Sequence, residues 1–192
     1  DGFAARGRCD FIKDYAERFP TTAFLYLFGL PEERLEDFLE LANGFFRTSD
    51  PAQKGVVIGR IFAELEVVFR EKQARPGNDI ASAILAGRDA NGEPHAWSDI
   101  LHCGFLLFVA GLDTVTASLD CMLAHLAQYP GQRQRIVDDS TIIPQAVEEM
   151  LRFDSALQLF ERTAMEDVEV GGVTVAKGEK IAVLIGSANR DG

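Results

Sequence analysis

The chain has 192 residues, of which 30 are Asp or Glu and 19 are Lys or Arg, so its formal net charge is −11. Hydrophobic residues make up 47% of the sequence, which is enough for a packed core and too much for a disordered chain. The acidic charge argues against nucleic acid and anionic membrane surfaces as partners, because basic side chains are needed to neutralise phosphates and acidic lipids.

The first half of the sequence favours helices. Residues 20–29 form a short apolar segment that Gly29 ends. Pro31, followed by two glutamates, is expected to occupy the first position of a second helix. In this helix apolar residues recur every three or four positions. A longer helix is predicted for residues 52–75. Asp79 can then cap a short helix over residues 80–85.

The longest predicted helix begins at Ser98 or Asp99 and continues to about Gln128, where Tyr-Pro-Gly stops it. Its centre, residues 104–110, is almost wholly apolar. A helix that is apolar all round is normally buried on all sides, so we expect this one to be the spine of the fold. Two shorter helices are predicted for residues 132–138 and 144–153.

Strand patterns replace helical ones near the end of the sequence. Alternating valines on either side of a Gly-Gly pair, over residues 168–175, indicate a β-hairpin, and residues 180–185 indicate a third strand. No repeat or linker divides the chain. The sequence therefore predicts a single, mainly α domain with a small β-sheet.

The centre of the predicted spine helix contains an unusual cluster, Ala110-Gly111-Leu112-Asp113-Thr114. Gly inside a helix costs about 1 kcal/mol relative to Ala, and Asp and Thr side chains compete for backbone hydrogen bonds. The cluster could therefore break the helix locally, and Asp113 and Thr114 would then offer a carboxylate and a hydroxyl for a proton relay. The alternative is structural: Gly111 packs against a neighbouring helix and Thr114 bonds to its own turn.

Two further features are ambiguous on their own. Glu149 and Arg152 are three residues apart, so they share a helix face and can pair, but exposed pairs of this kind are common. Arg162 follows the apolar run of residues 156–160. It is either a clamp for a carboxylate or phosphate or a surface residue whose stem covers its neighbours.

The order and spacing of these features resemble the cytochrome P450 superfamily, specifically its soluble bacterial type. An apolar helix with Ala-Gly-x-Asp-Thr precedes a Tyr-Pro-Gly stop, a helix with Glu-Glu-x-x-Arg, an Arg-Thr-Ala step, the hairpin and the final Ala-Asn-Arg-Asp, residues 188–191. The resemblance covers essentially the whole chain and is strongest over residues 106–191. It implies the P450 fold around a long central I helix, from about the D and E helices to the strands after the K helix.

The resemblance assigns roles to the central cluster. Ala110 and Gly111 match the positions that open an oxygen groove beside the haem. Thr114 matches the threonine that helps deliver protons during oxygen activation, and Asp113 matches the acid that feeds this relay from solvent.

The same resemblance assigns the remaining candidate residues. Leu106 and Val109 in the I helix, and Leu157 and Leu159 after the K helix, would line the substrate site. Arg162 matches the arginine that pairs with a haem propionate.

Glu149 and Arg152 match the K-helix Glu-x-x-Arg pair. In the family this pair is buried and structural, and a further partner nearer the C-terminus completes it.

The sequence departs from the family at the haem ligand, a cysteine thiolate in a Phe-x-x-Gly-x-x-x-Cys-x-Gly loop. That loop is absent, and Cys9, Cys103 and Cys121 lack its context, so we interpret them as ordinary small residues. The histidines fit no zinc pattern, so no metal ligand is assigned. We therefore expect residues 1–192 to be an incomplete domain, the central fragment of a P450, inactive alone.

The first functional hypothesis is therefore a fragment of a haem-thiolate monooxygenase. The intact protein would bind haem, take electrons from a ferredoxin-type donor and insert one oxygen atom from O2 into an apolar organic substrate. The alternative is a non-catalytic helical binding or interaction protein derived from this scaffold. We expect a cytoplasmic location, because no secretion signal is visible and the odd number of scattered cysteines suits a reducing compartment.

Overall fold

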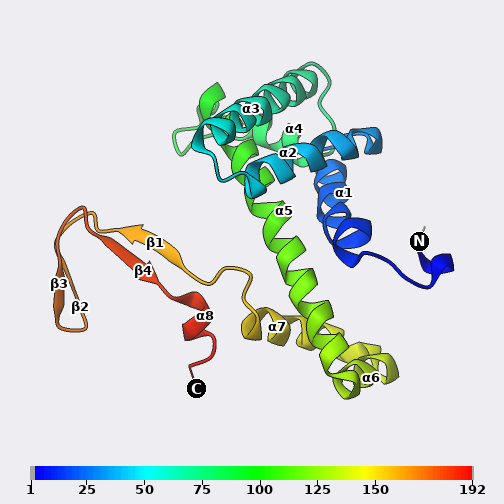
Figure 1. The fold of residues 1–192 in the computed structure, drawn as a ribbon. Helices are drawn as coiled ribbons and strands as arrows, with labels where there is room; N and C mark the ends of the chain where they lie inside the picture. The colour runs from blue at the N-terminus through cyan, green and yellow to red at the C-terminus, as the bar shows by residue number, and fades with distance from the viewer. Residues whose placement is uncertain (1–2, 192) are drawn as a thin grey trace. The chain divides into compact units, whose positions relative to one another are not determined.

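The structure, a computed structural model, describes residues 3–191 and is mostly helical, with two small antiparallel sheets (Figure 1). The chain divides into two compact units, the first ending at Thr116 and the second beginning at Ala117. The predicted mainly α fold with strands near the end of the sequence is confirmed.

The first unit gathers its helices around the N-terminal part of α5 (Figure 1). Its core is rich in phenylalanine rings, since Phe24 lies 4.2 Å from Phe28 and 5.6 Å from Phe108 between ring centroids. The elements of this unit are η1 (Ala4–Arg6), the π-helical turn η2 (Ile12–Ala16), α1 (Arg18–Leu27), η3 (Glu32–Arg34), α2 (Leu35–Arg47), α3 (Pro51–Ala74), α4 (Ile80–Ala86) and the first part of α5 (Trp97–Gln128).

Most of the predicted helix boundaries in this unit are confirmed. Gly29 ends the α1 region with φ +64°, a conformation that glycine adopts without strain. Asp79 caps α4 by accepting a hydrogen bond from the Ser82 N–H at 2.8 Å. Pro31 lies one position before the predicted first helical position: its backbone is extended (ψ 147°), and it precedes the 3-10 turn η3, which leads into α2 at Leu35. A proline φ suits both conformations, so the residue type alone does not separate them.

Helix α5 is continuous through the Ala-Gly-x-Asp-Thr cluster, so the expected local break is absent. The expected burial on all sides is also wrong. Only one face of α5 is buried in the first unit, whereas Leu106 on another face is 64% exposed. The buried residues are Ile100, Gly104, Phe108, Leu112 and Thr116.

Helix α5 resembles a membrane helix in length and composition. Among the described residues α5 is the one helix long and apolar enough to cross a bilayer, with a mean hydropathy of 1.7 over its most apolar stretch. Central helices of soluble proteins pass the same criterion, so this property alone does not make α5 a membrane span.

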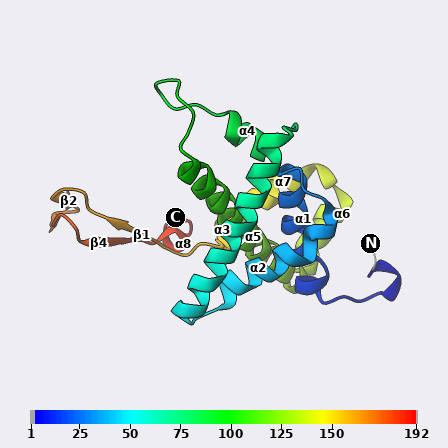
Figure 2. The ribbon, with the colours of Figure 1, turned by 90° about the horizontal axis from the view of Figure 1, so that it is seen from above.

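The second unit contains the end of α5, three further α-helices, a 3-10 turn and the strands (Figure 2). The hairpin turns through Gly171 and Gly172, both with positive φ, as the sequence predicted. Its remaining elements are α6 (Pro130–Asp138), η4 (Ser140–Ile142), α7 (Ile143–Phe153), β1 (Phe160–Thr163), β2 (Val168–Val170), β3 (Val173–Val175), β4 (Lys180–Val183) and α8 (Ile185–Ala188).

The predicted third strand is shorter than expected. It ends at Val183, because the chain forms the helical turn α8 from Ile185. It pairs with β1 in antiparallel register, Phe160 opposite Val183 and Thr163 opposite Lys180, while β2 and β3 form a separate pair.

Candidate functional site

Thr114 and Ala110 lie one turn apart on a face of α5 that the first unit leaves open. The Thr114 hydroxyl donates to the Ala110 carbonyl at 2.8 Å, as the structural interpretation of the sequence anticipated. Ala110 itself is exposed. A threonine hydroxyl can both donate and accept a hydrogen bond, so this residue type suits a relay.

Gly111 has no packing role in the described structure. A Cβ atom built at this position would have no atom of another segment within 4 Å. Gly104 on the same helix differs, because its Cβ would lie 2.7 Å from the Phe69 ring. The close helix contact that a glycine permits is therefore at Gly104, and Gly111 borders open space.

Asp113 belongs to a different face of α5 from Thr114, since successive helical residues are about 100° apart. It lines a small cavity of about 20 Å³ together with Glu17, Asn43 and Arg47. Arg47 donates to Glu17 Oε1 at 2.5 Å and to Asn43 Oδ1 at 2.8 Å. The acid therefore borders a charged cluster from α2 and from the turn before α1, while the hydroxyl faces the open side.

The four predicted substrate-lining residues fall into two groups. Leu106 lies on the exposed face of α5, whereas Val109 is half-buried and packs against the core of the first unit. Leu157 and Leu159 lie in the second unit, on the exposed segment that leads into β1.

Glu149 and Arg152 form the pair that their spacing predicted. Arg152 Nε and Nη2 both donate to the Glu149 carboxylate at 2.6 Å, a bidentate contact. This pairing lowers the pKa of Glu149. The expected burial of the pair is wrong in this structure, because the two side chains are 59% and 45% exposed. The further partner of Arg152 is the Asn189 carbonyl oxygen, at 2.5 Å from Nη1.

Arg162 lies within β1 and is exposed. Its Nη1 donates to the Glu161 carbonyl at 3.0 Å, and its guanidinium carbon is 5.2 Å from the Phe160 ring centroid. It pairs with no carboxylate of the described residues. The position is thus compatible with a carboxylate ligand.

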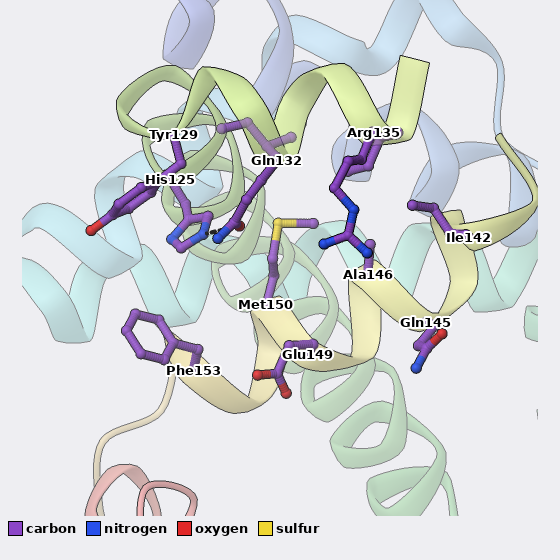
Figure 3. A pocket seen from close by; sticks show the side chains of 12 residues that line it. His125, Tyr129, Gln132, Arg135, Ile142, Gln145, Ala146, Glu149, Met150 and Phe153 are labelled. Carbon is purple, nitrogen blue, oxygen red and sulfur yellow. Dashed lines mark hydrogen bonds between the residues drawn. The ribbon is translucent and has the colours of Figure 1, made fainter. Parts of the chain in front are cut away.

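A larger cavity of about 560 Å³ lies within the second unit, between the end of α5, α6 and α7 (Figure 3). His125 Nε2 lies 2.8 Å from Gln132 Oε1 at one side, and Met150 points from α7 towards α6. Of the predicted site residues only Glu149 lines it.

The donor set fits a haem only in part. Small residues beside open space at Ala110 and Gly111 suit a flat apolar group. In the second unit, the guanidinium of Arg162 is of a type that suits a carboxylate. The three cysteines are free thiols, and none stands in the family's ligand loop. No group of three His, Cys, Asp or Glu side chains among residues 3–191 could hold a metal ion. An axial ligand is therefore missing from this set.

Comparison with known proteins identifies the family. The Cytochrome P450 family profile matches residues 57–192. The chain is 30% identical to the Vitamin D(3) 25-hydroxylase of Pseudonocardia autotrophica, over 99% of the chain and 47% of that protein. It is 31% identical to the Biotin biosynthesis cytochrome P450 of Bacillus subtilis, over 100% of the chain and 50% of that protein.

Solved structures agree. Cytochrome P450 CYP109Q5 from Chondromyces apiculatus superposes with a TM-score of 0.84 and 27% identity, over 94% of the chain and 45% of that structure. P450BioI, solved in complex with hexadec-9Z-enoic acid ligated acyl carrier protein, superposes with a TM-score of 0.89 and 26% identity. This match covers 100% of the chain and 50% of that structure.

The fold and these similarities define a bacterial-type protein of the P450 class. The chain belongs to the cytochrome P450 family, whose members bind haem. It spans about half the length of the curated relatives it matches.

Sequence reasoning missed the side chains that surround two of the site residues. Glu17, Asn43 and Arg47 come from elements at least 66 positions before Asp113, and no pattern links them to it. Asn189 and Arg190 carried part of the family resemblance, but their contacts with α7 were not foreseen.

Proposed function

We propose that the chain is the central part of a haem-thiolate monooxygenase and is inactive by itself. The intact enzyme would insert one oxygen atom of O2 into an apolar organic substrate. Two protons and two electrons reduce the other atom to water, and a ferredoxin-type protein in the cytoplasm would supply the electrons. Family membership supports this reaction class, and haem, when bound, supplies the oxygen chemistry.

The observation that carries the proposal is that Asp113 and Thr114, which are adjacent in sequence, lie on different faces of α5. Asp113 borders the charged cluster of Glu17 and Arg47, where protons can exchange with solvent. Thr114 lies on the open face beside Ala110, with its hydroxyl fixed by the Ala110 carbonyl. Neighbouring residues on two faces can thus pass a proton from the charged cluster to the face of α5 on which Thr114 lies.

Exposed apolar residues in each of the two units support an apolar substrate. Leu106 is exposed on α5, and Leu157 and Leu159 are exposed before β1. Exposed leucines are unfavourable in water, so ligand or further protein covering them would lower the free energy. Positioning of such a substrate is the role we assign to these side chains.

The test compares Thr114→Ala with Thr116→Ala in the full-length protein. Thr116 is a matched control, because its hydroxyl donates to Leu112 and Ala16 carbonyls on the buried face. Loss of a general acid–base group commonly costs about 10²–10⁴-fold in rate. We expect Thr114→Ala to release peroxide in place of product, while Thr116→Ala keeps the wild-type ratio. An unchanged ratio in Thr114→Ala would refute the assigned proton role.

The alternative, a non-catalytic helical binding protein, is favoured only by the exposed leucines of α5 and by the cavity beside α7. It predicts that the full-length protein binds an apolar ligand without a haem spectrum.

A further inference from the structure

The segment after α8 folds back on the C-terminal end of α7. Arg190 Nε and Nη2 both donate to the Phe153 carbonyl, at 2.8 and 2.5 Å. Nη2 also lies 3.0 Å from Asp154 Oδ1, and the guanidinium carbon is 4.5 Å from the Phe153 ring centroid. One arginine therefore holds a carbonyl, a carboxylate and a ring at the same helix end.

Asn189 completes the coordination of Arg152. Its carbonyl accepts from Arg152 Nη1 at 2.5 Å, and its side-chain Nδ2 donates to Ser155 Oγ at 2.7 Å. Because Nε and Nη2 of Arg152 already bind Glu149, all three guanidinium nitrogens have partners. The Asn189 carbonyl thus fixes the plane in which Arg152 meets Glu149.

The same segment completes the hydrogen bonds of α7. An α-helix leaves its last four carbonyls without helical partners. Here the Asp154 N–H donates to the Met150 carbonyl at 2.9 Å. The Ser155 hydroxyl lies 3.3 Å from each of the next two carbonyl oxygens, those of Leu151 and Arg152. The fourth carbonyl, that of Phe153, is bound by Arg190, whose positive charge also suits a helix C-terminus.

Other contacts hold α8 in place without Arg190. The Gly186 N–H donates to the Gln158 carbonyl at 3.0 Å. A Cβ at Gly186 would lie 2.3 Å from Gln158 Oε1, so the two segments are in close contact. Loss of the Arg190 side chain should therefore release the end of α7 while β4 and α8 stay folded.

We propose that Arg190 is a positioning residue for the Glu149/Arg152 pair. It closes the C-terminal end of α7 and keeps the Asn189 carbonyl against Arg152. The contact itself stands on the geometry alone. Its consequence for haem association rests on the proposed function, in which the pair supports the core of the enzyme.

The test of the contact is hydrogen exchange in the full-length protein, measured by mass spectrometry on peptides that cover residues 150–156. A hydrogen bond from a charged group stabilises a helix end against local opening, which is the step that permits exchange. Arg190→Gln removes this bond, so exchange in these peptides should become about tenfold faster. Arg190→Lys, which keeps the charge without the planar fork, should give an intermediate rate. Arg133→Gln on α6 removes another exposed arginine of the same unit and should leave the rate unchanged. Unchanged exchange in Arg190→Gln would overturn the proposal.

The test of the consequence is the absorption spectrum of the reduced carbon monoxide complex. We expect Arg190→Gln to lower the fraction with a thiolate-type Soret band, Arg190→Lys to restore part of it, and Arg133→Gln to match wild type. Faster exchange with an unaltered spectrum would confine Arg190 to stability and overturn the positioning role. If wild type shows no such band, the proposed function fails, and the exchange comparison alone decides on the contact.

Discussion

Lys72 Nζ lies 2.7 Å from Asp79 Oδ2 and 2.7 Å from the Gly29 carbonyl oxygen, so one ammonium joins the end of α3 to two turns. The pair is largely buried, with side-chain exposures of 14% and 7%. The other carboxylate oxygen of Asp79 caps α4 through Ser82. This corner fixes α3 and α4, which precede the site helix α5.

Removing the ammonium should be costly. In Lys72→Met the Asp79 carboxylate stays buried without its cation, a change that typically costs about 3–5 kcal/mol. Arg60→Met, which breaks an exposed pair with Glu40, should cost far less. Urea unfolding at neutral pH would measure both variants. Equal stabilities for the two variants would contradict the role of the buried pair.

The same corner should make stability depend on pH. Burial by itself would raise the pKa of Asp79, but hydrogen bonds from Lys72 and Ser82 outweigh it and hold the pKa below its usual 3.8. A lowered carboxyl pKa adds stability that is present above pH 3.8 and is lost as the pH falls through the folded-state pKa. Acid unfolding of Asp79→Asn should therefore show a weaker pH dependence below pH 3.8 than wild type.

Replacing Gly104 or Gly111 of α5 by alanine should change the stability of the protein in opposite directions. Gly104→Ala places a methyl group 2.7 Å from the Phe69 ring, and such overpacking costs about 1–3 kcal/mol. Gly111→Ala meets open space, so helix propensity alone should stabilise it by up to about 1 kcal/mol. Thermal unfolding of this chain would separate the pair. A large destabilisation by Gly111→Ala would show that its surroundings are not open.

Trp97, the single tryptophan of the chain, reports on the start of α5. Its Nε1 donates to Glu66 Oε2 at 2.6 Å, and the Arg70 guanidinium carbon lies 3.8 Å from its ring centroid. Glu66→Ala removes the acceptor and loosens Arg70, so we expect a red-shifted and broader tryptophan emission. Glu64→Ala on the same helix, which touches Arg34 instead, is the control. Identical spectra would contradict the contact.

Much of the fold could be predicted because local signals were strong. Asp79 followed by an apolar run indicates a helix start, and a Gly-Gly pair between alternating valines indicates a hairpin. The position of Pro31 was missed by one residue, since its φ suits both a helix start and extended chain. The burial of α5 was also misjudged, because composition gives the apolarity of a helix but not which of its faces are covered.

In the candidate site, contacts within one helix could be predicted from the sequence, but contacts between distant segments could not. Glu149 and Arg152 were predictable as a pair because three positions along a helix bring side chains together. The contact of Arg152 with Asn189 joins residues 37 positions apart, which no local periodicity encodes. The charged cluster beside Asp113 likewise depends on how α1 and α2 pack against α5.

The central claim, that this chain is part of a haem-thiolate enzyme but lacks the ligand, is tested most directly by one spectrum. The 192-residue chain and the full-length protein are each mixed with haem, reduced and exposed to carbon monoxide. We predict a thiolate-type Soret band for the full-length protein and none for the chain alone. The same band from the chain alone, or its absence from the full-length protein, would contradict the account.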